Sequence, residues 1–372
     1  MEIVENVKSE SSAIRIKKVA ILAGAMCAYW IGSGFTTGQE VLQFFAVNGL
    51  AGLGGGLIFL VMMGLFTYVL FTIGQKKQFK NPYTVFEYYC GTWLGKAYTW
   101  YNVVLIYAVF VVMLSGSGAT IHQHFGVPSQ VGTIIIGLLA LGTAILGIEK
   151  LINIIGVIGP VKILFIVVIG IAAIVTAFGN PQLVLENSAN MPHLGFEAAS
   201  PSWAWSGALY AFGTLISGIP FVVDCGASAG SVREARVSAI AGTIAFTVAI
   251  LLLTFAEVVY AGQIVGQQVP TLAIATYIAP ILGLVFAVLI VIAIYSSVSS
   301  FLLMTVRNFA QDKTKKFYIL TVALAAIGII FGGILPFDKL VNIIYPLAGY
   351  SAMLFVVIAG VKMVRDRSAA KG

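Results

Sequence analysis

Charged side chains are scarce in this sequence of 372 residues. Asp, Glu, Lys and Arg make up 9% of it, against roughly 25% in ordinary globular domains. A surface that faces water cannot be built from so few charges, which excludes a soluble enzyme, a nucleic-acid-binding protein and a disordered chain. Cysteine is also rare, and Cys27, Cys90 and Cys225 form no C-x-x-C pair, so neither a disulfide framework nor a zinc site is indicated. We expect no cofactor and no bound metal ion.

Hydrophobic residues make up 59% of the chain and gather in long runs. These runs approach or exceed the ~20 residues with which a helix crosses ~30 Å of hydrocarbon, and none alternates as barrel strands do. The expected fold class is an all-α polytopic membrane protein with ten spans. The expected spans are 19–47, 50–74, 97–121, 131–148, 151–178, 203–230, 237–261, 279–306, 317–335 and 340–363. The short aromatic stretch 81–95 predicts an interfacial helix, and 270–278 a short half-helix.

Lysine and arginine are distributed unequally between the two sides of these spans. If the N-terminus is cytoplasmic, nineteen of the 21 fall on that side, only Lys339 falls on the other, and Lys162 lies within a span. Positive residues favour cytoplasmic loops, so we expect a cell-membrane protein with both termini inside. The expected order is a cytoplasmic segment, a five-helix half, an extracellular loop, an inverted five-helix half and a cytoplasmic tail: 1–18, 19–178, 179–202, 203–363 and 364–372.

The first helix of each half contains residues that interrupt helices at membrane depth. The first has three glycines in its middle, Gly32, Gly34 and Gly38. In the second, Pro220 follows Ser217 and Gly218, and its ring clashes with the carbonyl four residues earlier, so the helix should kink or open. Such interruptions at corresponding positions of two halves point to a transporter's binding site. The alternative is that the glycines only permit close helix packing.

Interrupted helices expose backbone groups that a substrate can satisfy. The half-helix that begins near Phe35 directs its positive end at the first break, where a carboxylate is stabilised. The carboxyl ends of the other half-helices offer carbonyls to an ammonium group or a metal cation. A zwitterion such as an amino acid matches both ends.

The segment GSGFTTGQE, followed by VLQFF, resembles the first span of the YkvI-type family of amino-acid permeases. More distantly, GSG is similar to the signature of the amino acid–polyamine–organocation (APC) superfamily, whose members share the LeuT-type five-plus-five inverted-repeat fold. The resemblance implies that the substrate carboxylate is held by the amides of Ser33, Gly34 and Phe35. It also implies that the substrate amine is received by carbonyls near Ile31, Ser217 and Ile219. Gly32 and Gly218 complete this candidate site.

Lys162 is an ionisable residue within the fifth span. An intramembrane charge costs ~2.5–3.5 kcal/mol on insertion scales, so such a residue is a functional candidate. The alternative is that the helix begins at Pro160 and that Lys162 extends its ammonium group outward to the interface.

Three other polar residues are candidates for ion coupling. Ser296 and Ser297 lie on one flank of the eighth span, although such hydroxyls often bond to their own helix. The resemblance implies competing roles, because a hydroxyl pair in this span helps to coordinate sodium in LeuT-type symporters, whereas a lysine in the fifth span replaces that ion in some proton-coupled APC members. Asp224 is a candidate either for a gate pair with Arg233 or Arg236 or for a proton site.

Aromatic and acidic residues near the centre of the spans have open roles. Tyr107, in the third span, and Phe212, in the sixth, are candidates either for closing over a substrate or for packing. Glu40 and Glu257 lie in outer half-spans and are expected to line an aqueous vestibule.

Together these features favour a secondary active transporter of a small zwitterion, first of all an amino acid, working by alternating access as a monomer or weak homo-oligomer. A charged Lys162 would repel a second cation, so we expect proton-coupled or exchange transport rather than sodium symport through the serines. One alternative is a LeuT-type receptor subunit of the germinant-sensing kind, which binds without transporting. A metal-ion transporter is disfavoured because neither break supplies Asp, Asn, Met or His ligands. No nucleotide-binding motif is present, which excludes an ATP-driven pump.

Overall fold

The computed structural model describes residues 14–146 and 149–369, and every regular element among them is a helix. The first part contains α1 (Ile16–Trp30), α2 (Ser33–Thr36), α3 (Gln39–Phe44), η1 (Ala46–Asn48), α4 (Ala51–Lys77), α5 (Thr84–Phe125), α6 (Ser129–Leu146) and α7 (Glu149–Gly179). The second contains α8 (Pro181–Asn190), η2 (Met191–His193), α9 (Trp203–Ala227), α10 (Val232–Val259), α11 (Ala261–Ile264), α12 (Pro270–Ile278), α13 (Pro280–Arg307), α14 (Lys315–Ile334) and α15 (Phe337–Ala369).

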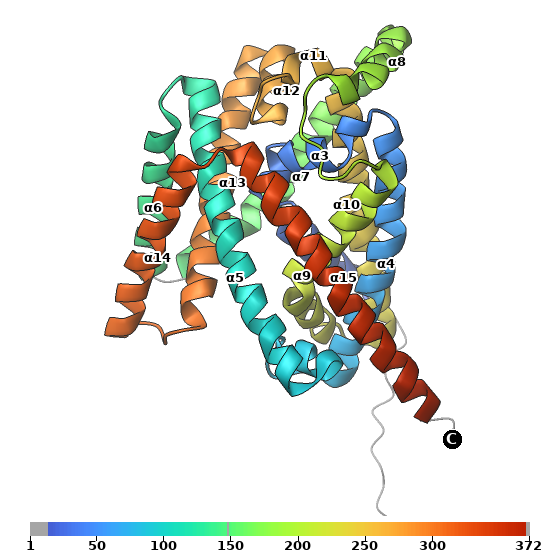
Figure 1. Ribbon diagram of the computed structural model, residues 1–372, viewed down its shortest axis with the longest axis vertical. Helices are drawn as coiled ribbons and strands as arrows, with labels where there is room; N and C mark the ends of the chain where they lie inside the picture. Colours follow the sequence, from blue (N-terminus) through green and yellow to red (C-terminus); the bar gives the residue numbers. More distant parts are fainter. Residues whose placement is uncertain (1–13, 147–148, 370–372) are drawn as a thin grey trace, which may run out of the picture.

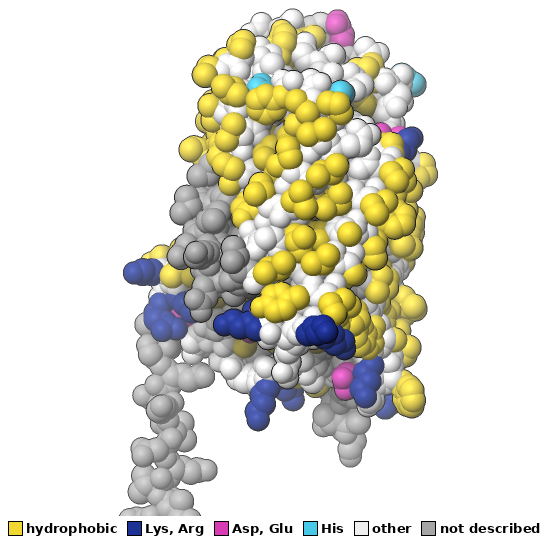
Figure 2. Space-filling model, turned by 90° about the vertical axis from the view of Figure 1, so that its left-hand side faces the viewer, with side chains coloured by type: hydrophobic (Ala, Val, Ile, Leu, Met, Phe, Trp, Pro, Cys, Tyr) yellow, Lys and Arg dark blue, Asp and Glu magenta, His cyan; other side chains and the backbone are white. Residues whose placement is uncertain are grey.

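The protein is an all-helical polytopic membrane protein. Eight helices of the described part are long and apolar enough to cross a membrane, namely α4, α5, α7, α9, α10, α13, α14 and α15. The apolar α6 is shorter, and the first predicted span is divided among α1, α2 and α3. Hydrophobic side chains cover most of the face shown in Figure 2, whereas Lys and Arg gather near its lower end.

Eight of the helices form two groups of four. In one group α1 and α4 pack on α9 and α10, and in the other α5, α6, α13 and α14 all contact one another. The second group lies on the left of Figure 1. The helix α7 packs on α10 and α13, and α15 packs on α9 and α5. Each group thus takes two consecutive helices from each predicted half.

Several connecting segments also contain helices. The stretch 270–278 forms α12, as predicted. The stretch 81–95, predicted to form a short interfacial helix, contains the first part of α5, a short helix that a kink at Gly91, where φ is 76°, separates from the long helix that follows. The stretch 179–202 contains α8, at the upper end of Figure 1, and α15 continues beyond residue 363 to Ala369.

The predicted break in the first span is confirmed, and the span is interrupted twice. The helix α1 ends at Trp30, and Ile31 and Gly32 are not helical. The chain makes one turn in α2 and is interrupted again at Thr37 and Gly38 before α3 begins. At Gly38 φ is 86°, a left-handed conformation that favours glycine.

The predicted opening of the sixth span is wrong, because α9 runs as one helix from Trp203 to Ala227 with Pro220 inside it. Pro220 lacks the amide hydrogen that would bond to the carbonyl of Ile216. The side-chain amide of Asn102, on α5, donates to this carbonyl at 2.7 Å. A neighbouring side chain thus satisfies the carbonyl that the proline leaves free within a continuous helix.

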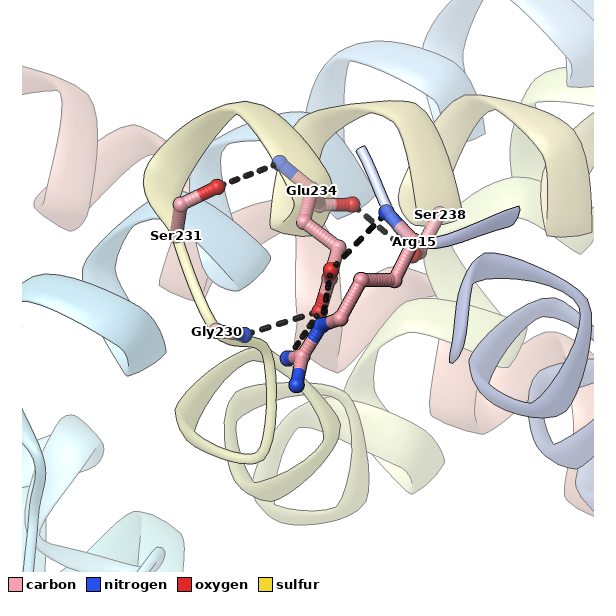
Figure 3. Close-up of polar contacts among 5 residues, drawn as sticks. All are labelled: Arg15, Gly230, Ser231, Glu234 and Ser238. Atoms are coloured by element: carbon pink, nitrogen blue, oxygen red, sulfur yellow. Dashed lines mark hydrogen bonds and ion pairs between the residues drawn. The ribbon is translucent and has the colours of Figure 1, made fainter. Parts of the chain in front are cut away.

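An ion pair and several hydrogen bonds join the beginning of α1 to the beginning of α10 (Figure 3). The Arg15 guanidinium donates to both carboxylate oxygens of Glu234, at 3.0 Å each, and the Gly230 amide donates to Oε1 at 2.8 Å. The hydroxyl of Ser231 accepts from the Glu234 amide at 3.1 Å and caps α10. Glu234 is buried while the Arg15 side chain is exposed. We call this contact the Arg15–Glu234 latch.

Candidate substrate site

A cavity of about 80 Å³ lies where the first break meets the middle of α9. Residues from α1, the break, α3, α5, α9, α13 and α15 line it: Tyr29, Trp30, Gly32, Glu40, Leu105, Ile106, Val109, Met113, Tyr210, Gly213, Thr214, Ser217, Phe301, Ile344, Tyr345 and Ala348. The cavity therefore lies between the two groups of helices, with α15 along one side. Pockets for drug-sized ligands measure ~300–1,000 Å³, so this space suits a small solute.

Lys162 lies directly beside the first break. Its Nζ donates to the carbonyl of Ile31 at 3.0 Å, and the side chain is 7% exposed. The alternative in which Lys162 extends to the interface is therefore wrong, because its ammonium group turns inward to a helix end. The carboxyl end of a helix carries unpaired carbonyls and a partial negative charge, which favour a cation. The Ile31 carbonyl, which the resemblance implied for a substrate amine, thus already has a donor within the protein.

Glu40 is buried against the other side of the break and lines the cavity. The hydroxyl of Tyr210 donates to its Oε2 at 2.9 Å, and the hydroxyl of Tyr345 also hydrogen-bonds to the carboxyl group. Gly34 lies so close that a Cβ atom there would collide with this carboxyl group. The expectation that Glu40 lines an aqueous vestibule is wrong, since tyrosines and backbone enclose it.

Glu257 is fully buried near the second interruption, which also contradicts a vestibule position. A Cβ atom on Gly38 would contact its carboxyl group, and neither oxygen has a hydrogen-bond partner within residues 14–146 and 149–369. From α12, the amide and hydroxyl of Thr271 donate to the carbonyls of Thr37 and Thr36, at 3.1 and 2.8 Å. The helix α12 thus covers this interruption.

The predicted residues of α9 divide between the cavity and its packing. Ser217 lines the cavity, and its carbonyl accepts from the hydroxyl of Tyr29 at 2.8 Å. Gly218 packs against the indole of Trp30, where a Cβ atom would lie 2.9 Å from Nε1. Ile219 is buried and does not line the cavity. The structure therefore brings the first break and the middle of α9 together.

In the first span, Gly32 lines the cavity. Phe35 is buried, and its ring packs on Phe246 with the centroids 5.1 Å apart. Ser33 begins α2, so the short helix starts two residues before the predicted position.

Tyr107 and Phe212 do not line this cavity, and their contacts favour the packing alternative for both residues. The cavity face of α5 carries residues 105, 106, 109 and 113, and Tyr107 lies off this face. Its hydroxyl donates to the carbonyl of Leu324 on α14 at 2.9 Å. Phe212 packs against Phe66 of α4, with the ring centroids 5.6 Å apart.

The serine hydroxyls of α13 bond to their own helix, as the alternative interpretation expected. Ser296 and Ser297 both donate to the carbonyl of Ala293, at 3.0 and 3.1 Å. The short α2 packs against this helix. Their hydroxyl hydrogens are thus held within α13.

Asp224 is exposed, and the predicted gate pair is wrong for the part of the chain that the structure describes: neither Arg233 nor Arg236 forms an ion pair with it there. Arg236 instead donates to the hydroxyl of Thr72 at 3.2 Å. The ion pair near this turn is the Arg15–Glu234 latch, which the sequence analysis did not identify.

Glu40, Tyr210 and Tyr345 were missed as a cluster. The sequence did contain one signal, since Glu40 is a carboxyl group six residues after Gly34 in an apolar segment. The two tyrosines carry no comparable signal, because they lie far along the chain on α9 and α15.

No family model matches the chain. Two uncharacterized proteins of Bacillus subtilis (strain 168) are similar to it: YyaD is 23% identical over 332 residues, which cover 88% of this chain and 91% of YyaD. The membrane protein YkvI is 23% identical over 339 residues, which cover 88% of this chain and 90% of YkvI.

Two solved structures share the fold. The crystal structure of MhsT in complex with L-phenylalanine matches with a TM-score of 0.60 and 19% identity, covering 92% of this chain and 89% of MhsT. A manganese transporter of Eremococcus coleocola matches with a TM-score of 0.57 and 15% identity, covering 95% of this chain and 80% of the transporter. The resemblance to the YkvI type is thus confirmed, and the chain is a distant homologue of YkvI and YyaD with a LeuT-like transporter fold.

Proposed function

We propose that the protein is a secondary transporter that moves a small amine-bearing solute across the cell membrane by alternating access, with an amino acid as the first candidate from the sequence. The observation that carries this proposal is the small cavity between the two groups of helices, at an interrupted helix. Transporter sites typically lie at such interruptions. MhsT, which has this fold, holds L-phenylalanine in its crystal structure.

The proposed topology has ten crossings, made by the eight long apolar helices, α6 and the interrupted α1–α3. The halves 19–178 and 203–363 would be inverted repeats. Both termini would be cytoplasmic, because nineteen of the 21 lysines and arginines then lie on that side. The Arg15–Glu234 latch would be at the inner end and α12 at the outer end.

Alternating access then requires each end of the bundle to open in turn. The inner end opens when α1 leaves α10, which breaks the Arg15–Glu234 latch. The outer end opens when α12 leaves the second interruption, which breaks the two bonds from Thr271. Both contacts are present in this structure, which would therefore correspond to an intermediate that is closed at both ends.

Lys162 is proposed to stand in the place of a coupling sodium ion. Its ammonium group binds the Ile31 carbonyl at the break, while the hydroxyls of Ser296 and Ser297 bond to α13 itself. A second cation ~4 Å away would meet ~4 kcal/mol of repulsion at an effective dielectric constant of about 20. Transport would therefore be coupled to protons or proceed by exchange.

Uptake into liposomes by the purified full-length protein tests this function. Radiolabelled alanine should accumulate above protein-free liposomes when a proton gradient is applied, and replacing sodium with potassium should leave the rate unchanged. Binding without uptake would instead indicate a sensor, and a steep dependence on sodium would assign coupling to the serines of α13.

A further inference from the structure

The substrate cavity has one acidic group and no basic group among its lining residues. Glu40 is the acidic group, and it forms no ion pair within the described residues. Lys162 is bound to Ile31 and does not line the cavity. A buried carboxylate without a counter-charge is unfavourable, and either a proton or a cationic ligand would relieve it.

The carboxyl group also lies directly against Gly34, one of the residues where the resemblance placed the substrate carboxylate. Two tyrosine hydroxyls hydrogen-bond to it. A substrate carboxylate at this position would meet a like charge, whereas an ammonium group would meet an opposite one.

The remaining walls suit an organic cation. Five aromatic residues line the cavity, namely Tyr29, Trp30, Tyr210, Phe301 and Tyr345. Aromatic rings attract ammonium groups through their negative faces, and clusters of such rings bind methylated amines. The volume of about 80 Å³ restricts the cation to a small one.

We propose that the Glu40 carboxylate, held by Tyr210 and Tyr345, binds the ammonium group of a small organic amine, and that the site prefers such an amine to the amino acid with the same side chain. This inference rests on the proposed transport function and names its substrate class. The amine supplies the positive charge that the cavity lacks, and the absence of a carboxylate avoids repulsion by Glu40.

Matched pairs of ligands test the preference. The full-length protein in detergent is titrated with ethylamine against alanine, with isobutylamine against valine, and with alaninamide, which keeps the ammonium group of alanine but carries no carboxylate. We expect each amine and alaninamide to bind at least tenfold more tightly than the matched amino acid. Equal or tighter binding of the amino acids would overturn the proposal.

Glu40→Gln keeps the shape of the side chain and removes its charge. We expect roughly 10- to 100-fold weaker binding of ethylamine, as for the loss of a hydrogen bond between charged groups. Glu257→Gln is the matched control, because Glu257 is also buried but does not line the cavity, and it should retain the wild-type affinity. An unchanged affinity in Glu40→Gln, or an equal loss in both variants, would contradict the assignment. If Glu40→Gln does not fold, Tyr345→Phe must weaken ethylamine binding for the proposal to stand.

Uptake separates the two proposals. If ethylamine binds through Glu40 but proteoliposomes take up neither ethylamine nor alanine, the transport function fails and the binding site stands. If alanine is transported and ethylamine binds no better than alanine, the transport function stands and the proposed substrate class fails.

Discussion

Two helices lose backbone hydrogen bonds inside the membrane, and the protein satisfies the freed carbonyls in different ways. At the end of α1, the Ile31 carbonyl accepts from the ammonium group of Lys162 at 3.0 Å. In α9, the Ile216 carbonyl freed by Pro220 accepts from the side-chain amide of Asn102 at 2.7 Å, and the helix continues. A lysine can lose its proton and with it its positive charge, whereas an amide cannot. We infer that a proton can change the charge at the contact in α1, whereas the contact in α9 stays neutral.

The largest effect is expected at Lys162. Lys162→Met removes the donor from a buried carbonyl and the charge from the break, so uptake should fall more than tenfold and lose its dependence on pH. The unpaired carbonyl should also cost about 1–3 kcal/mol of stability, which thermal unfolding in detergent would measure. Lys339→Met removes an exposed lysine that pairs with Glu197, and it should change neither property appreciably. If Lys162→Met takes up substrate at the wild-type rate, the Lys162 contact has no special role in transport and does not differ in this respect from the Asn102 contact.

Asn102→Leu should have the second-largest effect. It leaves the Ile216 carbonyl without its side-chain donor in a fully buried position and should cost about 1–3 kcal/mol of stability. The pH dependence of uptake should remain that of the wild type, because no titratable group is removed. A changed pH profile would show that α9 also takes part in switching.

The sequence predicted the first break but not the partners of either carbonyl. Closely spaced glycines make the backbone locally flexible, and this property of the sequence identified the interruption around Gly32. The partner of Ile216 lies 114 residues away on another helix, so it depends on how α5 packs against α9. Local rules treat proline as a helix breaker, and they therefore predicted that the helix would kink or open, whereas α9 runs through Pro220 as one helix.

The candidate site shows the same limit. Long apolar runs predicted the eight helices that are long and apolar enough to cross a membrane, because hydrophobicity over ~20 residues is a property of the segment itself. Which face of α5 meets the cavity is a property of the assembled bundle, so the sequence left the role of Tyr107 open between substrate contact and packing. The cluster around Glu40 joins α3 to a tyrosine 170 residues away, so tertiary packing alone reveals it.

Pro220→Ala tests whether the proline is the reason for Asn102. Alanine restores an amide that can bond to the Ile216 carbonyl, so the single variant should change stability by less than about 1 kcal/mol. In the double variant with Asn102→Leu it should recover most of the lost stability, and a double-mutant cycle of unfolding free energies measures this coupling. Additive effects of the two substitutions would show that Asn102 stabilises α9 in another way.

Tyr29→Phe is expected to have a smaller effect than Asn102→Leu, although it also removes a donor to a carbonyl of α9. Its hydroxyl donates to the Ser217 carbonyl at 2.8 Å, and its ring stacks on Phe221 with the centroids 4.3 Å apart. Phe221 has an amide four residues after Ser217, so this carbonyl keeps its helical partner, unlike that of Ile216. The ring stacking also remains in phenylalanine, so the loss should be about 0.5–1.5 kcal/mol. The loss of stability is measured by the same thermal unfolding. A loss as large as that of Asn102→Leu would contradict the explanation that the cost of Asn102→Leu comes from leaving a carbonyl unpaired.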